Sequence, residues 1–211
     1  MSKHHSGIKN IGAILPQALG GLAMLLVVGG VILVSSAYTI DEAEQAIVVQ
    51  FGRPIGDPIT TPGLHFKLPF VQEVRRFDKR FLSWDGDPNQ IPTRGEQFIS
   101  VDTTARWRIS DPLTFLQRVH DERGAINRLN DILDSVVRDH ISASELSEIV
   151  RSHDWKVAEE DLKRALAAED EEKELLQKVS VGREQLVASI LKTAQEMMYA
   201  YGIELEDIRI K

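Results

Sequence analysis

A long, uninterrupted apolar run lies near the N-terminus of the chain. Residues 18–37 read ALGGLAMLLVVGGVILVSSA and contain no charged side chain. A helix of this length measures about 30 Å, which is the hydrocarbon thickness of a bilayer. A buried core helix is usually shorter, and the glycines in this run are typical of helices that pack within membranes. The run therefore predicts a transmembrane helix at 18–38, after a short N-terminal tail at 1–17.

The charges on either side of this run favour one orientation. Lys3 and Lys9 precede it, and only Arg53 follows it closely. The positive-inside rule then places the N-terminus in the cytoplasm and the rest of the chain on the other side. A cleaved signal peptide is the alternative, because residues 35–37 are small enough for a cleavage site. The run exceeds the usual apolar region of a signal peptide, about 7–15 residues, so an uncleaved anchor is favoured.

The pattern after the apolar run predicts an α+β domain that begins with strands. Apolar and polar residues alternate in 45–51 and again in 99–109, as expected of strands with one buried face. A less regular alternation predicts another strand at 74–84. In 64–70 the large apolar side chains fall on one face of a strand, namely Leu64, Phe66, Leu68 and Phe70. We expect these segments to form an antiparallel sheet with one face exposed to water.

Helices follow these strands. Asp111-Pro112 combines an N-cap acid with proline at the first helical position, which predicts a helix start. Apolar residues then recur at three- and four-residue spacing in 126–140, the pattern of an amphipathic helix. Ser142 and Glu145 have the spacing of a capping box, in which each side chain satisfies the other residue's backbone N–H. We therefore expect a second helix start there.

The C-terminal region predicts a helix and then a strand. Residues 183–201 have the most regular helical pattern of the chain, and Gly202 is a natural stop. Residues 203–211 return to strand, with a bulge expected near Asp207 because the apolar parity changes there. The expected buried stripe of the helix is wide, with Val187, Ile190, Ala194, Met197 and Tyr201 flanked by Leu186, Leu191 and Met198.

A charged helical insertion is predicted at about 152–182. Its central part, 155–179, contains Glu169-Asp170-Glu171-Glu172 between scattered apolar positions. The simple interpretation is a helix with a solvated face, because blocks of charge usually mark exposed surface. The functional interpretation is an acidic arm that contacts a neighbouring subunit.

Charge and composition exclude several kinds of function. The chain has a formal net charge of −7, and outside its first 40 residues it carries 23 Lys and Arg against 32 Asp and Glu. Nucleic-acid binding is disfavoured, because phosphate contacts need clustered basic side chains. The chain has no cysteine, which excludes disulfides, thiolate catalysis and Cys-ligated metals.

The sequence offers no catalytic constellation, so we predict no catalytic, cofactor-binding or metal-ligating residue and no enzyme activity. The motifs of the hydrolase elbow, dinucleotide binding and the phosphate-binding loop are all absent. The histidines that follow the apolar run form no metal-ligand spacing: His65, His120, His140 and His153.

Several motifs resemble the SPFH (band 7) family, which includes stomatins, prohibitins, flotillins and HflK/HflC. The chain has FGR at 51–53 and PGLHFKLPF at 62–70, shortly after the apolar run. The similarity continues through WRISDP at 107–112 and ends with YGIE at 201–204 and DIRI at 207–210. It thus covers 38–211, and WRISDP and the charged insertion are more like the HflC-type members than the stomatins.

The resemblance implies a non-catalytic scaffold with an SPFH domain at 39–211. Such a protein is a single-pass protein of the bacterial inner membrane with its body in the periplasm. It assembles with itself and an HflK-like subunit into a ring or cage that regulates the membrane AAA protease FtsH, and it needs no cofactor. Family members continue into a coiled coil, so we expect natural sequence beyond Lys211. The alternatives are a stomatin-like organiser of membrane microdomains with its body in the cytosol, and a membrane-anchored hydrolase.

Overall fold

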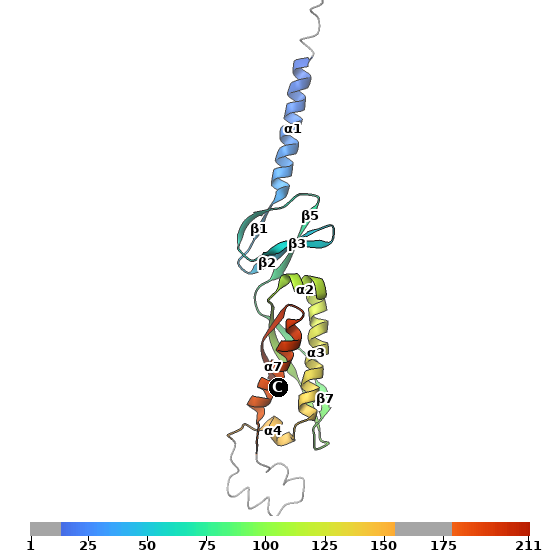
Figure 1. Ribbon diagram of the computed structural model, residues 1–211, viewed down its shortest axis with the longest axis vertical. Helices are drawn as coiled ribbons and strands as arrows, with labels where there is room; N and C mark the ends of the chain where they lie inside the picture. The colour runs from blue at the N-terminus through green and yellow to red at the C-terminus, as the bar shows by residue number, and fades with distance from the viewer. Residues whose placement is uncertain (1–13, 155–178) are drawn as a thin grey trace, which may run out of the picture. The chain divides into compact units, whose positions relative to one another are not determined.

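The computed structural model describes residues 14–154 and 179–211, with the side chains of the first helix described at Gly21 and from Met24 onward. Figure 1 shows the order of the elements. The N-terminal elements are α1 (Ile14–Ser36), β1 (Ala37–Ile40), β2 (Glu44–Gln50), β3 (Arg53–Ile59), β4 (Gly63–Phe66) and β5 (Gln72–Asp78). The next are β6 (Leu82–Asp85), β7 (Asn89–Pro92), β8 (Phe98–Val101) and β9 (Thr103–Ile109). The last are α2 (Pro112–Arg118), α3 (Glu122–Ser142), α4 (Leu146–Val150), α7 (Arg183–Tyr199) and β10 (Ile203–Ile210).

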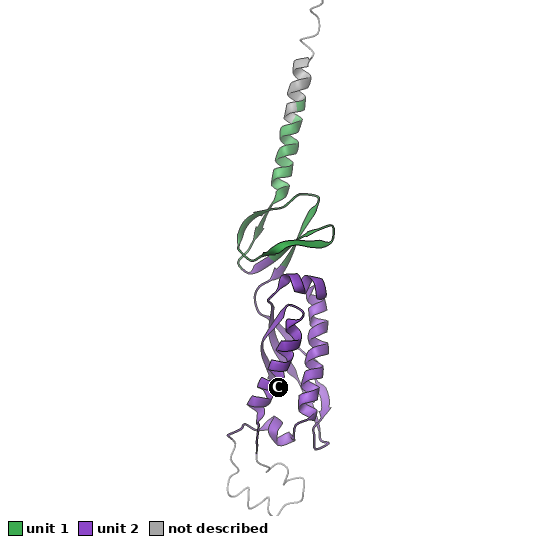
Figure 2. Ribbon diagram, in the orientation of Figure 1, with its two compact units in different colours: residues 1–42, 46–76 green, residues 43–45, 77–211 purple. Residues whose placement is uncertain are grey.

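The chain divides into two compact units, coloured separately in Figure 2. Unit 1 comprises residues 1–42 and 46–76, and unit 2 comprises 43–45 and 77–211. The boundary falls within the strands β2 and β5. The fold is α+β, as expected, but its strands form several small sheets in place of the one sheet that the sequence predicts.

Unit 1 combines α1 with short strands around a small core. β1 pairs antiparallel with β4, and β2 lies between β3 and β5. A small buried cluster contains Tyr38, Ile40 and Ala46, against which Ile59 and Val74 pack, and Ile47 and Val49 of β2 are buried as well. So few buried side chains provide little hydrophobic stabilisation, because that stabilisation grows with the apolar area removed from water.

Unit 2 has the main hydrophobic core. Its antiparallel sheet has the order β10-β9-β6, and α3 and α7 contribute much of the core that also contains the inner face of this sheet. The alternation expected in 99–109 is confirmed, with Val101, Ala105 and Trp107 buried, although the segment is divided into β8 and β9 at Asp102. The largest fully buried side chains of this unit include Trp107, Phe115, Leu129, Leu133 and Met198.

The bulge predicted near Asp207 is confirmed. The register of β10 against β9 shifts between Leu205 and Asp207. The extra residue returns Ile208 to the face that also buries Ile203 and Leu205. Gly202, which precedes the strand, has a φ of 72°, so it provides the left-handed residue that ends the helical segment.

Of the two predicted helix starts in the middle of the chain, one is confirmed and one is wrong. Asp111 caps α2, and its carboxylate accepts from the backbone N–H groups of Leu113 and Thr114. Ser142 does not start a helix, because it is the last residue of α3 and its hydroxyl donates to the carbonyl of Arg138. Glu145 precedes α4 without a side-chain capping bond. The amphipathic pattern of 126–140 continues to Ser142, so the serine bonds backwards along its own helix.

The other differences concern the ends and faces of elements. The strand expected over 64–70 ends at Phe66, and 74–84 contains two strands, β5 and β6. In α7 the buried residues are Leu186, Ile190, Ala194 and Met198. These four residues belong to the expected wide stripe, whereas Met197 at its centre is 45% exposed. Met197 and Met198 are both apolar, so the sequence pattern alone could not decide which of them faces the core.

Two predictions about segments remain. A helix, α1, lies where the apolar run predicts one, but within the described part of the chain no helix is long and apolar enough to cross a membrane. The transmembrane helix at 18–38 stays a prediction. Most of the charged insertion expected at 152–182 lies outside the described residues, which stop at Asp154 and resume at Val179.

Glu148, in α4 just before that insertion, binds the residues at the C-terminal end of the insertion. Its carboxylate accepts hydrogen bonds from the backbone N–H groups of Ser180, Val181 and Gly182 and from the Ser180 hydroxyl, at 2.6–2.9 Å. Burial raises the pKa of Glu148, but these hydrogen bonds outweigh it and lower the pKa to about 2. In addition, the N–H of Arg183 donates to the carbonyl of Arg151 at 2.8 Å. We call this group of contacts the Glu148 clasp.

Candidate functional site

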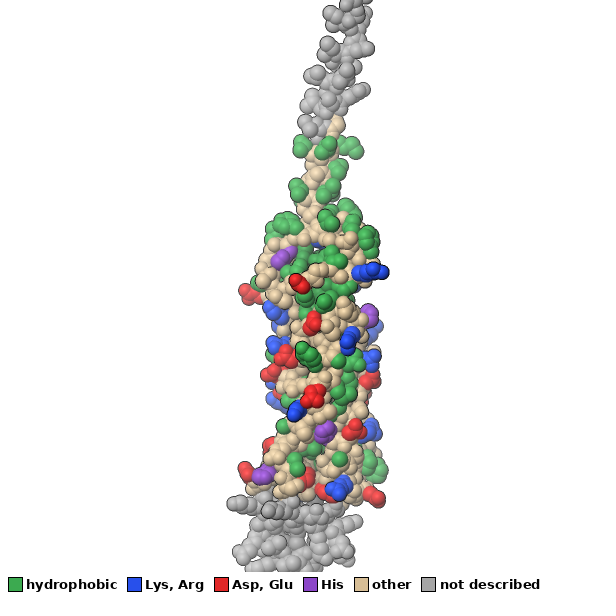
Figure 3. All heavy atoms as spheres, in the orientation of Figure 1, with side chains coloured by type: hydrophobic (Ala, Val, Ile, Leu, Met, Phe, Trp, Pro, Cys, Tyr) green, Lys and Arg blue, Asp and Glu red, His purple; other side chains and the backbone are tan. Residues whose placement is uncertain are grey.

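Unit 1 exposes an unusual number of large apolar side chains. Figure 3 shows hydrophobic side chains gathered on this unit beside the C-terminal end of α1. We call the most exposed of them outside α1 the apolar rim: Phe51 (82% exposed), Leu64 (61%), Phe66 (69%), Leu68 (58%) and Phe70 (90%). Apolar patches exposed on a folded protein usually mark a surface that contacts a membrane, a partner or a ligand.

Strand register places one side of the rim at the end of α1. β1 follows α1 directly, and its first residue, Ala37, lies opposite Phe66 in β4. The N–H of Lys67 donates to the carbonyl of Ser36, the last residue of α1, at 2.8 Å. The segment that continues from Phe66 to Phe70 therefore begins at the point where α1 ends.

Hydrogen bonds of Gln72 connect this segment to the β2–β3 turn. The backbone N–H of Gln72 donates to the carbonyl of Leu68 at 3.0 Å, and the N–H of Leu68 donates to Gln72 Oε1 at 2.8 Å. Gln72 Nε2 in turn donates to Gln50 Oε1 at 3.2 Å, and Gln50 immediately precedes Phe51. Two loops that are about twenty residues apart in the sequence are thus fixed to one another.

The two most exposed aromatic residues of the rim also have an uncommon backbone conformation. The φ angle is 49° at Phe51 and 65° at Phe70. A bulky residue with a left-handed backbone is strained by roughly 1–2 kcal/mol, and such positions usually go to Gly or Asn. The chain therefore places phenylalanine, exposed to solvent, at two positions where a smaller polar residue would relieve strain. Strain of this kind is often found at functional surfaces.

Beneath the rim, the opposite face of β4 packs on the unit 1 core. His65 lies opposite Tyr38 in the β1–β4 register, and the two ring centroids are 5.8 Å apart. A ring nitrogen of His65, Nε2, is 2.9 Å from the carbonyl of Thr61. The two faces of β4 therefore differ from the usual arrangement, since the half-buried face is polar and the exposed face is apolar.

The sequence pattern identifies part of the rim, but it does not show that this apolar face is exposed. The pattern in 64–70 correctly places Leu64 and Phe66 on one face, and an apolar face is ordinarily expected to be buried against protein. The alternation in 45–51 places Phe51 in the predicted strand, but β2 ends at Gln50 and Phe51 lies in the turn that follows. The available indication is the position of Phe51 and Phe70 in turns, where large apolar residues are uncommon.

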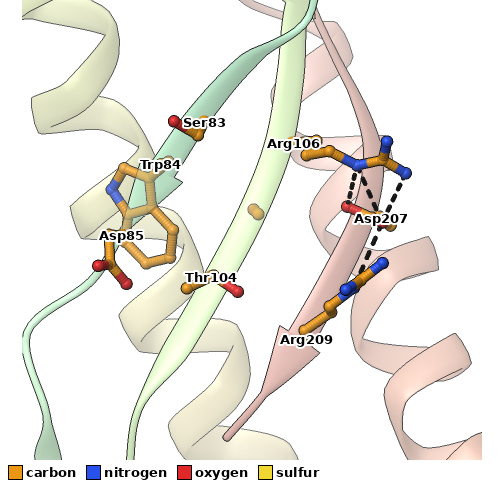
Figure 4. A pocket seen from close by; sticks show the side chains of 8 residues that line it. Ser83, Trp84, Asp85, Thr104, Arg106, Asp207 and Arg209 are labelled. Carbon is orange, nitrogen blue, oxygen red and sulfur yellow. Dashed lines mark hydrogen bonds and ion pairs between the residues drawn. The ribbon is translucent and has the colours of Figure 1, made fainter.

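The outer face of the unit 2 sheet is different in character. Figure 4 shows a pocket lined by residues of β6, β9 and β10, including Ser83, Thr104 and Arg106, with a volume of about 330 Å³. Arg106 donates two hydrogen bonds from Nε and one from Nη2 to the Asp207 carboxylate, at 2.7–3.1 Å, and Arg209 lies 3.7 Å from the same group. The hydrogen bond from Arg106 lowers the pKa of Asp207, and the same hydrogen bond raises the pKa of Arg106.

Because its pKa is lowered, the Asp207 carboxyl of this pocket differs from the carboxyls with a raised pKa that serve in acid–base chemistry. Next to it, Arg108 makes a two-bonded ion pair with Glu204 at 2.9 Å and lies over the ring of Phe81. The outer face of the sheet therefore carries cross-strand ion pairs, and such a polar face is suited to contact with water.

The histidines of the described residues are separated from one another. His140 Nδ1 is 2.8 Å from the carbonyl of Val136, as in a residue that bonds to its own helix. His153 lies 3.5 Å from the Asp154 carboxylate, and both side chains are largely exposed. Within residues 14–154 and 179–211 no group of three or more His, Asp or Glu side chains is placed to hold a metal ion.

The fold and the rim together define a class of protein: an α+β module with a small, apolar unit attached to a helix and a larger, well-packed unit. The profile of the SPFH domain / Band 7 family matches residues 38–211, and the chain therefore belongs to that family. Within it, the chain is similar to proteins named HflC. It is 36% identical over 198 residues to Protein HflC of Treponema pallidum (strain Nichols) and 32% identical over 177 residues to Protein HflC of Borreliella burgdorferi.

A further relative carries a functional name. The chain is 32% identical over 92 residues to the Escherichia coli (strain K12) protein named Modulator of FtsH protease HflC, a match that covers 41% of this chain and 28% of that protein. The matches to the two spirochaete proteins cover 90% and 82% of this chain but only 60% and 54% of theirs. The chain thus spans at most about 60% of the length of these relatives.

Proposed function

We propose that this chain is the membrane-proximal part of a non-catalytic scaffold that modulates an FtsH-like membrane protease. The observation that carries the proposal is the apolar rim at the C-terminal end of α1, together with the similarity to proteins named HflC. The names of the relatives describe a modulator of a protease rather than an enzyme that acts on a substrate. The proposed role is accordingly one of position and assembly.

The proposed anchor is the apolar run at 18–38, which includes most of α1. Residues 18–37 contain no charge, and the described part of α1 exposes Met24, Leu25, Leu26, Val27 and Leu33 by 66–71% each. Side chains this apolar on an isolated helix are expected to be covered by lipid, because water solvates them poorly. The rim then lies at the membrane surface, since it begins where α1 ends.

For the orientation we propose a single-pass protein of the bacterial inner membrane with residues 1–17 in the cytoplasm and the two units in the periplasm. Lys3 and Lys9 before the anchor support it through the positive-inside rule. A periplasmic reporter enzyme fused after Lys211 should be active, while a reporter that works only in the cytosol should not. The reverse result would instead support a stomatin-like organiser of membrane microdomains with its body in the cytosol.

The proposed partners are the bilayer, further copies of this chain, an HflK-like subunit and the FtsH-like protease. The native full-length protein, co-expressed with an HflK-like protein of the same organism and extracted in mild detergent, is expected to elute as a megadalton assembly that contains both. Degradation of a membrane substrate by the protease should slow when the assembly is present. A chain that elutes only as a monomer, with the partner present and folded, contradicts the proposal.

A further inference from the structure

Two basic residues, Arg53 and Lys67, lie next to rim residues in the sequence and have no carboxylate partner in the part of the chain that the structure describes. Arg53 follows the Phe51-Gly52 turn and is exposed, and Lys67 stands half-buried between Phe66 and Leu68. Among the described residues, neither side chain forms an ion pair with a carboxylate. Elsewhere the arrangement is different, as Arg75 pairs with Glu73 at 3.5 Å and Arg80 with Asp78 at 2.8 Å.

Strand register and hydrogen bonds bring the backbones of these two residues to one junction. Arg53 lies opposite Gln50 at the closed end of the β2–β3 hairpin, and Lys67 immediately precedes Leu68. Gln72 bonds to both Gln50 and Leu68, so the two basic residues flank a single hydrogen-bonded junction. The backbone of Lys67 is also fixed to the last residue of α1. Neither charge therefore depends on a flexible tail for its position.

A surface that combines phenylalanine or leucine with an unpaired cation is suited to binding at the interface between lipid and water. Apolar side chains enter the region between headgroups and acyl chains, while arginine and lysine extend their charges towards the phosphates. Electrostatic attraction to anionic lipids then adds to the burial of apolar area. A protein partner that covered the same surface would have to place acidic groups beside an apolar patch, whereas an anionic bilayer supplies both properties at once.

We infer that Arg53 and Lys67 form a binding site for the headgroups of anionic phospholipids, so that unit 1 selects anionic over zwitterionic lipid around the anchor. This inference rests on the proposed function, in which the rim lies at the membrane surface. Each basic side chain close to an anionic surface contributes a preference of up to about fivefold. Salt at about 1 M should remove most of it, since the screening length falls to about 3 Å.

The test uses the full chain reconstituted in phosphatidylcholine vesicles that contain a trace of spin-labelled phosphatidylglycerol or spin-labelled phosphatidylcholine. The fraction of motionally restricted lipid gives the relative association of the two headgroups with the protein. The wild type is expected to prefer phosphatidylglycerol several-fold at low salt. The double variant Arg53→Gln/Lys67→Gln should lose most of this preference, by up to about fivefold for each side chain.

Arg75→Gln is the matched control, because it removes one charge of unit 1 whose partner is Glu73 and which lies outside the rim. It should leave the preference unchanged, and Lys3 and Lys9 are common to all the variants. An equal preference in the wild type and the double variant, or an equal loss in Arg75→Gln, overturns the inference. No headgroup preference in the wild type overturns it as well.

A second measurement separates this failure from failure of the proposed function. The chain has no cysteine, so Val71→Cys, next to Phe70, accepts a single fluorophore. Quenching by nitroxide lipids in every variant, without headgroup preference, means that the rim lies in the bilayer but that Arg53 and Lys67 do not select the lipid. Absence of quenching in the labelled Val71→Cys chain that is otherwise wild type shows that the rim does not contact lipid, which contradicts both proposals and identifies the surface as a protein contact.

Discussion

The two units of this molecule differ in how many of their large apolar side chains they bury. In unit 2, Trp107 and Phe115 are fully buried, and the charged residues of the outer sheet face pair with one another. In unit 1, Phe51 and Phe70 are more than 80% exposed, and Arg53 and Lys67 have no carboxylate partner among the described residues. Unit 2 therefore pairs the charges of its outer sheet face, whereas unit 1 exposes large apolar side chains beside cations without a described carboxylate partner.

This difference predicts that residues important for stability and residues important for function lie in different units. The large core of unit 2 provides hydrophobic stabilisation in proportion to its buried area, while the small core of unit 1 provides little. Residues whose removal unfolds the protein should thus lie in unit 2, and residues whose removal affects its seating in a membrane should lie in unit 1. The following substitutions sharpen or break that separation.

The largest effect is expected from Phe115→Ala in unit 2. Phe115 is fully buried and its ring packs edge-to-face on Phe77, with centroids 5.5 Å apart. Removing a buried phenylalanine leaves a cavity and lowers the free energy of unfolding by about 3–5 kcal/mol. Urea unfolding of the full chain in micelles measures it, since Trp84 and Trp107 are buried fluorescent reporters of unit 2. Phe70→Ala should change the same value by less than about 0.5 kcal/mol, and a similar loss in both variants would break the comparison.

The next effect concerns the Glu148 clasp. Glu148→Gln removes a carboxylate that accepts four hydrogen bonds, and should lower the free energy of unfolding at pH 7 by about 1–2 kcal/mol. Because the folded pKa is lowered from 4.5 to about 2, the stabilisation is present above pH 4.5 and is lost as the pH falls towards 2.

The pH dependence of this variant provides the control. In Glu148→Gln the fall in stability between pH 4.5 and pH 2 should be smaller than in the wild type. Glu145→Gln is the matched variant, because the Glu145 carboxylate contacts only the exposed Arg94 side chain, at 3.5 Å, among the ion pairs described. It should retain the wild-type pH profile. Identical profiles for Glu148→Gln and the wild type would show that the clasp does not stabilise unit 2.

The smallest effect is expected at the strained backbone of the rim. Asparagine tolerates a positive φ, so Phe70→Asn should relieve strain and slow hydrogen exchange of the β1 and β4 amides severalfold, equivalent to about 0.5–1 kcal/mol. Phe70→Ala keeps the Cβ atom and should not slow it. Faster exchange in Phe70→Asn would mean that the aromatic ring, and not the backbone, determines local stability at this position.

The sequence predicted the parts of the fold that depend on local chemistry. The Asp111 cap, the bulge before Asp207 and the stop at Gly202 all follow from one or two residues and their neighbours. The Glu148 clasp was not predictable, because it joins α4 to residues 32–34 positions later and nothing in the sequence marks the pairing. In α7 the pattern does not decide which of the adjacent Met197 and Met198 is buried, because both side chains are apolar.

The rim shows a more general limit of sequence patterns. The alternation in 64–70 reports that Leu64 and Phe66 share an apolar face, and it does so equally for a face that contacts protein and for one that contacts lipid. Both environments exclude water, and the hydrophobic effect does not distinguish between them. Only the exposure of that face in the folded unit, at the end of α1, separates the two cases.

The most direct test of this account compares the surroundings of one residue from each unit. Phe70→Cys and Ser135→Cys each introduce a single cysteine, on the rim and on the exposed surface of α3, into a chain that has none. Spin labels at the two sites in reconstituted vesicles should differ in collision with oxygen, which concentrates in lipid, and with a water-soluble nickel complex. The account predicts that position 70 favours oxygen and position 135 favours nickel. Equal and high accessibility to nickel at both positions would contradict it.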